Sequence, residues 1–240
     1  MSFAVEAGAS HQSVCALVGG SSNKLDAALG AQGRQPEAVL RQPGSFRTGL
    51  DAALETGATW VWVLDGSVAP RPDALHSLLG ALDRVDELPD PAILVGVVRA
   101  ADGTIEPGRA IWYRRNQIEP AMAAVARRLL PVRATAGPVL VRREAIEAEP
   151  PPADASLSPS VELEWTARIL RERTGYLVPE SESDALGVLE DPLAQPLTAA
   201  RLMFGGAFAR LDRARILYEL AERIGTRLTA SGSAGPRPLP

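Results

Sequence analysis

The sequence predicts a single α/β domain with a mixed, mainly parallel sheet and helices on its faces. Between residues 13 and 179, short apolar segments rich in β-branched residues alternate with amphipathic segments, which is typical of strand–helix units. The 240 residues are 46% hydrophobic, which is enough to bury a complete core. We therefore expect one domain over residues 13–196, preceded by a polar lead over residues 1–12.

The first half of the chain contains three predicted strand–helix units. Apolar runs at 13–18, 37–40 and 60–64 predict strands, and the continuous run at 60–64 predicts one buried on both faces. Helices are expected at 24–32 and at 46–55, the second ending near Gly57. Pro70 and Pro72 are expected near the first turn of a third helix, whose apolar stripe consists of Leu75, Leu78, Leu79 and Leu82.

The second half predicts antiparallel strands that make the sheet mixed. A strand at 92–100, a Gly-containing turn at 101–108 and a strand at 109–115 form a hairpin pattern. The later segments predict, in order, a helix at 120–130, a strand and short helix at 137–146, a loop at 147–160, a helix at 161–175 closed by Gly175 and a strand at 176–179. Residues 197–229 have the spacing of an amphipathic helix, and 230–240 have the composition of a disordered tail.

Composition limits the classes of partner and compartment. The net charge of −4 argues against a protein that binds nucleic acid by general electrostatic attraction. The single cysteine excludes an intramolecular disulfide. Neither a signal-peptide pattern nor an apolar run long enough to span a bilayer is found, so we expect a cytoplasmic protein.

Chemistry is expected at the carboxyl end of the strand at 60–64, where Asp65 follows directly. Ligands of open α/β sheets bind at that end of the strands, and an acid there can hold a divalent cation that bridges to phosphates. The residue two positions further on is Ser67, a neutral and weaker ligand for such a cation.

Five segments resemble, in order, those of family 2 glycosyltransferases with the GT-A fold. They are the segment with Arg47 and Gly49, GSFRTGLDAALETGA; the Asp-x-Asp segment, VWVLDGSVAPRPDAL; the hairpin ILVGVVRAADGTIEPGRAIWY; the strand AGPVLVRREAI; and the helix SVELEWTARILRERTGYLVP. The resemblance implies inverting transfer of a hexosyl or deoxyhexosyl group from a nucleotide-sugar donor to a glycan or lipid-linked acceptor.

The resemblance also assigns roles to residues. Glu162 lies on the position of the catalytic base and Glu164 on that of a second acid. Arg47, Asp65 and Ser67 lie on the donor side, with Asp65 as the ligand of a Mn²⁺ or Mg²⁺ ion whose affinity Ser67 weakens. The acid that helps hold the nucleotide base in the family has no counterpart in EAVLRQPGS at 37–45.

Two other functions remain open from the sequence. Ser67 and the missing early acid favour a catalytically degenerate glycosyltransferase-like protein that binds a partner without turnover. A nucleotidyltransferase is a minor alternative, because VGGSSNK is a weak version of a phosphate-binding loop. The arginine-rich segment 197–229 predicts either homodimer packing or contact with a membrane surface, the second at the inner face of the membrane.

Overall fold

The computed structural model describes residues 12–20, 22–42, 44–85, 88–105, 110–112 and 127–187. The predicted lead before Gln12, the amphipathic segment 197–229 and the tail 230–240 lie outside these residues. Within the described part, no helix is long and apolar enough to cross a membrane.

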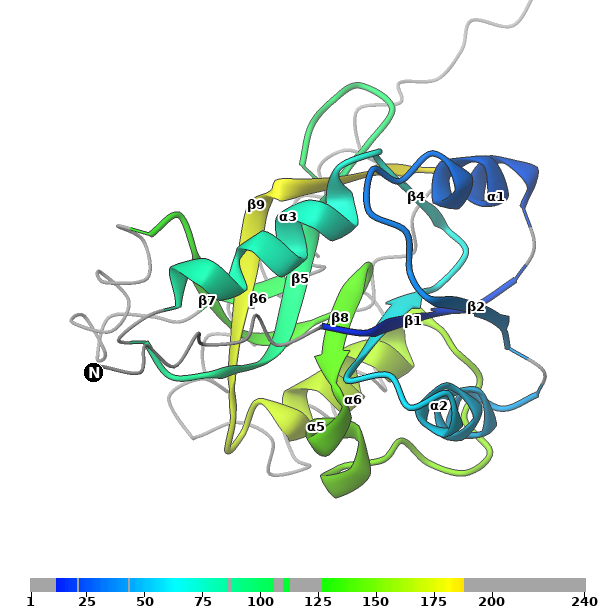
Figure 1. Cartoon of the computed structure of the whole chain (residues 1–240), viewed down its shortest axis with the longest axis vertical. Helices are drawn as coiled ribbons and strands as arrows, with labels where there is room; N and C mark the ends of the chain where they lie inside the picture. The colour runs from blue at the N-terminus through cyan, green and yellow to red at the C-terminus, as the bar shows by residue number, and fades with distance from the viewer. Residues whose placement is uncertain are drawn as a thin grey trace, which may run out of the picture.

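Nine strands and a set of short helices make up the described chain (Figure 1). The strands are β1 (Val14–Val18), β2 (Ala38–Arg41), β3 (Trp60–Leu64), β4 (Val68–Pro70), β5 (Pro91–Arg99), β6 (Ala110–Trp112), β7 (Leu130–Thr135), β8 (Val139–Arg142) and β9 (Thr174–Ala185). The helices are α1 (Asn23–Gly30), α2 (Phe46–Glu55), α3 (Ala74–Gly80), the 3₁₀ turn η1 (Leu82–Arg84), α5 (Arg143–Ala148) and α6 (Pro159–Ile169).

The strands form one mixed sheet in the order β2-β1-β3-β8-β5-β9-β7-β6, with β4 paired to the end of β9. The β1 strand is parallel to β2 and β3, and β5 is parallel to β9. The strands β8, β7 and β4 run against their neighbours. The predicted α/β class with a mixed sheet is therefore confirmed.

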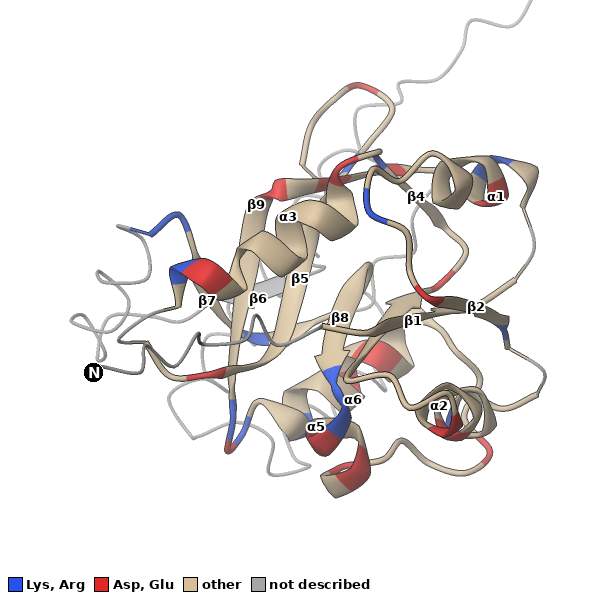
Figure 2. Ribbon diagram, viewed as in Figure 1, with Lys and Arg blue, Asp and Glu red and all other residues tan. Residues whose placement is uncertain are grey.

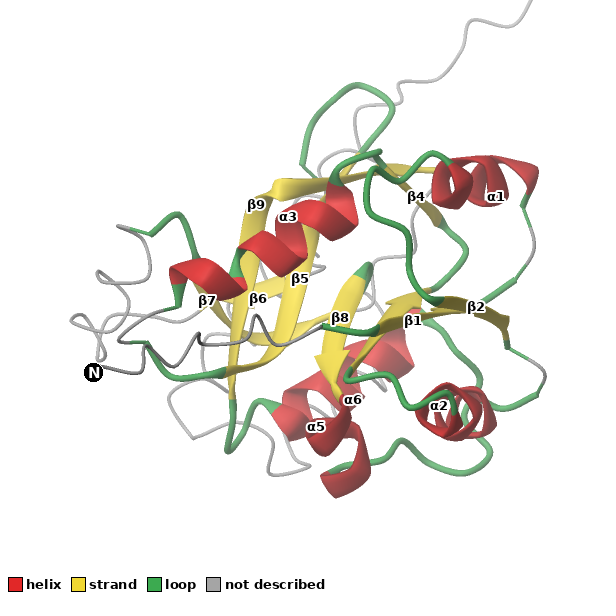
Figure 3. Cartoon of the chain, viewed as in Figure 1, coloured by secondary structure: helices red, strands yellow, loops and turns green. Residues whose placement is uncertain are grey.

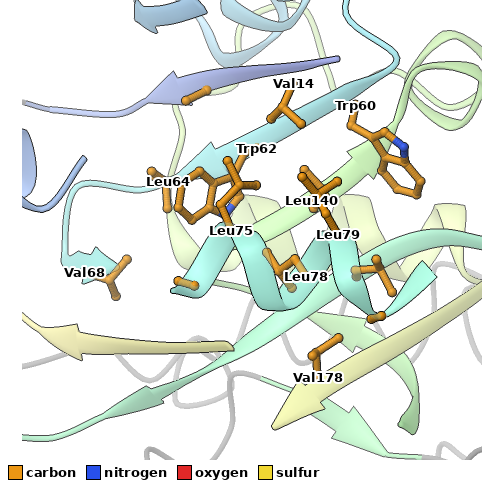
Figure 4. Packing of buried hydrophobic residues seen from close by; sticks show 14 of the residues in the cluster. Val14, Trp60, Trp62, Leu64, Val68, Leu75, Leu78, Leu79, Leu140 and Val178 are labelled. Carbon is orange, nitrogen blue, oxygen red and sulfur yellow. The ribbon is translucent and has the colours of Figure 1, made fainter. Parts of the chain in front are cut away.

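Helices cover both faces of the sheet (Figure 3). The alternation of side chains along β3 separates two cores: Trp60 and Trp62 face α1 and α3, whereas Val61 and Val63 face α2, α5 and α6. Figure 4 shows Leu75, Leu78 and Leu79 of α3 packed against the first of these cores. This three-layer packing explains why β3 is apolar at every position, as a strand buried on both faces must be.

The predicted bounds of β3 and α2 agree with the structure. The hydroxyl of Ser45 accepts the Thr48 amide at 3.2 Å, which caps the start of α2. After the helix, Gly57 adopts a positive φ of 81°, which is the left-handed conformation that glycine tolerates.

The charged groups lie mainly on the helices, on the loops and at strand ends (Figure 2).

Pro70 belongs to a strand and does not sit near the first turn of the third helix, which corrects the prediction. It ends β4, which pairs with β9 opposite Ser183, and α3 begins only at Ala74. Proline lacks a backbone N–H, but Pro70 is the last residue of a short strand with one described neighbour. Its missing donor therefore interrupts no hydrogen bonds between inner strands of the sheet.

The helix predicted at 161–175 ends at Ile169, and Gly175 belongs to the next strand. A Cβ atom at Gly175 would lie 2.7 Å from Leu170 Cδ2 and 3.3 Å from Ile93 Cβ, so this glycine permits close packing and does not close a helix. The strand predicted at 176–179 is the middle of the twelve-residue β9.

The helix predicted at 120–130 lies mostly outside the described residues. Its described end is a turn with Arg128 at φ 57°, followed by Leu130, the first residue of β7. The strand β7 was not predicted from the sequence. Its side chains follow no clear alternation, with proline and arginine among apolar residues.

Candidate functional site

The candidate site lies at the topological switch point of the sheet. From β1 the chain crosses to β2 on one side, and from β2 it returns to β3 on the other side of β1. Ligands of open α/β sheets bind outside the carboxyl ends of the strands at such a point. Gly19 follows the carboxyl end of β1, and Asp65 follows the carboxyl end of β3. The Gly19 amide donates to the Leu64 carbonyl at 2.7 Å.

Asp65 is half-buried and begins a tight turn. Its Oδ1 accepts hydrogen bonds from the Ser67 amide at 2.9 Å and from the Ser67 hydroxyl at 2.7 Å. This is the Asx-type turn that aspartate forms with the backbone two residues later. Asp65 and Ser67 thus contact each other within one turn, and the Ser67 hydroxyl donates to the carboxylate that was expected to bind the metal.

Gly66 holds this turn against the end of β1. Its φ is 80°, and a Cβ atom added there would lie 2.0 Å from the Gly19 carbonyl oxygen. On the other side, the Ser67 carbonyl accepts the Leu186 amide at 2.8 Å, just past β9. The turn is therefore anchored by two segments distant in sequence.

Glu162 reaches the same edge of the sheet from α6. Its Oε2 accepts the Gly137 amide at 3.1 Å, and the side chain is fully buried. Gly137, at φ 129°, precedes β8, and β8 places Val139 opposite Val63. Because β8 is antiparallel to β3, the residues before Val139 lie at the edge where Asp65 leaves β3.

The two other predicted residues lie apart from this contact. Glu164 is half-buried on α6. Arg47, in the first turn of α2, makes an ion pair with Asp51 one turn later, with Nε 3.1 Å from Oδ1. The roles predicted for these side chains in donor and acid chemistry stay predictions.

Two backbone positions and one side chain at this edge escaped the sequence analysis. Gly19 lies in the VGGSSNK segment and Gly137 in the AGPVLVRREAI segment, but their roles of close packing and positive φ were not predicted, because glycine is common in ordinary turns. Leu157 lies in a Pro/Ser-rich segment without apolar periodicity. Its side chain nevertheless packs against Gly19: a Cβ atom there would lie 2.7 Å from Leu157 Cδ2.

The donor set at the turn is small for a metal ion. It comprises the carboxylate of Asp65 and the hydroxyl of Ser67, and among the described residues no cluster of three or more His, Cys, Asp or Glu is arranged to hold a metal. Mg²⁺ is commonly held by one or two carboxylates together with substrate phosphates. The residues present fit a Mg²⁺ or Mn²⁺ ion only if a diphosphate completes the coordination.

The strand order, the helices on both faces and the acidic turn at the switch point define a GT-A-like glycosyltransferase fold. The crystal structure of S. aureus TarS residues 1–349 is similar to this chain, with a TM-score of 0.51 and 11% identity over 88% of this chain and 71% of that one. The same protein in complex with UDP-GlcNAc has a TM-score of 0.51 at 11% identity, covering 88% and 72%.

GalNAc-T7 with UDP, GalNAc and Mn²⁺ is a more distant neighbour, with a TM-score of 0.48 and 10% identity over 75% of this chain and 45% of that chain. No protein-family profile matches the sequence, and no curated protein sequence does. At these identities the comparisons show the fold, and the function has to be argued from the site.

Proposed function

We propose that the protein is a glycosyltransferase of the family 2 type, which transfers a hexosyl or deoxyhexosyl group with inversion from a nucleotide sugar to a glycan or lipid-linked acceptor. The observation that supports it is that Asp65 and Glu162 are both placed at one edge of the sheet. Asp65 arrives from β3, and Glu162 arrives from α6 through its bond to Gly137. An acid on each side of a bound sugar is what this reaction needs.

In the proposed reaction, an acceptor hydroxyl oxygen attacks the anomeric carbon while the bond from that carbon to the diphosphate breaks. The hydroxyl proton passes to a carboxylate base, and the nucleoside diphosphate leaves with the electron pair of the broken bond. Glu162 is the proposed base. Because its side chain is fully buried, an acceptor meets it only after a neighbouring segment moves.

On the donor side, Asp65 is the proposed contact for the diphosphate or its metal ion, and Arg47, which is paired with Asp51 on α2, is proposed as a further cation for the donor. A bound Mg²⁺ or Mn²⁺ would offset the negative charge of the leaving diphosphate. Asp65 is held in one orientation by the Ser67 amide and hydroxyl, so its carboxylate does not have to be ordered when the donor binds.

The base assignment is tested by Glu162→Gln. Glutamine keeps an oxygen that can accept the Gly137 amide, so the fold should persist while release of nucleoside diphosphate falls by roughly 10²–10⁴-fold. Glu147→Gln, on the exposed side of α5, is the matched control and should keep full activity. A Glu162→Gln protein with unchanged turnover would contradict the assignment.

Donor binding is tested separately by thermal shift with nucleoside diphosphates and nucleotide sugars, each with and without Mn²⁺ or Mg²⁺. Stabilisation by a nucleotide that increases with metal supports the proposal. If none of these ligands changes the melting temperature, the donor side of the proposal fails.

A catalytically degenerate binding protein is the second candidate. Two features favour it. Ser67 stands where a second acidic metal ligand is expected, and Oδ1 of Asp65 already accepts hydrogen bonds from the Ser67 amide and hydroxyl. Turnover of any nucleotide sugar by the purified protein would eliminate this candidate.

The predicted basic segment 197–229 and the predicted cytoplasmic location suggest how a lipid-linked acceptor is reached. We propose contact of this segment with the inner face of the membrane. Cosedimentation with phosphatidylglycerol vesicles, lost on truncation at residue 196, supports the contact. Loss of a dimer on the same truncation supports packing between subunits instead.

A further inference from the structure

The segment from Glu149 to Ser158, here called the strap, crosses from α5 to α6 and is fixed at both ends. The Trp165 indole donates to the Glu149 carbonyl at 2.6 Å, and the Arg168 guanidinium donates to the Pro150 carbonyl at 3.1 Å. At the other end, the Ser158 hydroxyl accepts the Val161 amide at 3.4 Å as the cap of α6. The strap ends are therefore tied to the same helix that carries Glu162.

The middle of the strap is tied to the switch point by two contacts. The Ala155 carbonyl accepts the Phe46 amide at 2.7 Å, from the first residue of α2. The Leu157 side chain, half-buried, lies against Gly19, where an added Cβ would be 2.7 Å from Leu157 Cδ2 and 3.4 Å from the Asp65 carbonyl. Leu157 thus lies against the residue that follows β1, and the Asp65 carbonyl after β3 lies close to that same residue.

The strap middle is held more weakly than its ends. Residues 152–154 and Ser156 are exposed, and within the described part of the chain the strap middle is held by the hydrogen bond from Phe46 to Ala155 and by the half-buried Leu157. Segments with few buried contacts open locally at much lower free energy than the whole domain unfolds. Leu157 lies next to Gly19, outside the carboxyl end of β1, which is where ligands of open α/β sheets bind.

We propose that the strap is a lid over the switch point, closed by Leu157 on Gly19 and displaced when the nucleotide part of the donor binds. This inference rests on the proposed function and adds to it a conformational step. It also supplies the movement that a fully buried Glu162 needs, because the strap leads directly into α6.

The lid is tested with Leu157→Ala. Removing the leucine lowers the closed population, so the apparent Kd for a nucleoside diphosphate should fall about tenfold relative to the wild type. Leu54→Ala is the matched control, because Leu54 is another partly buried leucine on the same core but lies at the far end of α2. It should lower the stability without changing the affinity. UDP, GDP, ADP, CDP and dTDP are the probes, measured by calorimetry.

A second readout is hydrogen exchange at the Phe46 amide, which the strap protects through Ala155. A bound nucleotide should speed this exchange in the wild type. If a nucleotide binds wild type and Leu157→Ala equally and Phe46 exchange does not change, the lid is refuted and the proposed function stands. Binding to Leu157→Ala but not to the wild type supports the lid. If neither protein binds any probe, both the lid and the proposed function are wrong.

Discussion

Gly66→Ala is the substitution whose effect the structure defines most sharply, because one added carbon atom meets two separate obstacles. The φ of 80° places an alanine in the left-handed region, which costs about 1–2 kcal/mol. The new Cβ would also lie 2.0 Å from the Gly19 carbonyl oxygen, about half of an ordinary van der Waals separation, and a backbone atom cannot move aside like a side chain.

Relief of that clash requires the turn to leave β1. The shift would strain the Gly19 amide bond to Leu64 and the bonds from Ser67 to Asp65, and each hydrogen bond contributes about 1 kcal/mol. The combined loss is roughly 3–5 kcal/mol, a large fraction of the 5–15 kcal/mol of a typical domain. For a chain of this size it corresponds to a fall in Tm of roughly 10 °C.

Two other glycines separate the two obstacles. Gly20 has a φ of 74° but no atom within 4 Å of an added Cβ, so Gly20→Ala should lose only the conformational part, about 1–2 kcal/mol. Gly80 ends α3 with open space around it, and Gly80→Ala should be neutral or stabilising by up to about 1 kcal/mol. Urea unfolding followed by tryptophan fluorescence measures all three. Equal losses for Gly66→Ala and Gly20→Ala would show that the contact with Gly19 is not as described.

Three further predictions concern the proposed metal ligand Ser67, the buried side chain of Gln32 and the ion pair of Glu182 on β9. Ser67→Asp should strengthen Mn²⁺-dependent nucleotide binding roughly tenfold, about 1.4 kcal/mol, in calorimetry; no gain would show that Ser67 is not the limiting ligand. Gln32→Ala should lower the free energy of unfolding by about 2–3 kcal/mol, because the buried Gln32 amide donates to the Arg71 carbonyl at 2.8 Å and its oxygen accepts the Leu75 amide at 3.2 Å. A urea titration with a loss below about 1 kcal/mol would contradict that role. The hydrogen bond from Arg99, aided by its charge, holds the pKa of Glu182 below its ordinary value of 4.5. The ion pair therefore stabilises the fold above that pH and is lost as the pH falls through the folded pKa; Glu182→Gln should flatten this acid limb in pH-dependent urea melts.

Much of the fold could be predicted because the signals are local. The apolar run of β3 is set by burial on both faces, and the bounds of α2 follow from a capping serine and a terminal glycine within a few residues. Local signals were ambiguous where a glycine has two possible uses. Gly175 resembles a helix end in sequence, yet it allows β9 to pack against Leu170 and Ile93.

At the site, the printed sequence was enough to predict that Asp65 leaves a buried strand and that Ser67 follows at the position where a second acid would strengthen a metal site. The burial of Glu162 against Gly137 at the same edge and the packing of Leu157 on Gly19 became known from the folded chain. The difference lies in the range over which the signals act. Periodicity, capping and turn chemistry act between residues a few positions apart, whereas strand register and the packing of a loop on a distant glycine depend on how the whole sheet is assembled.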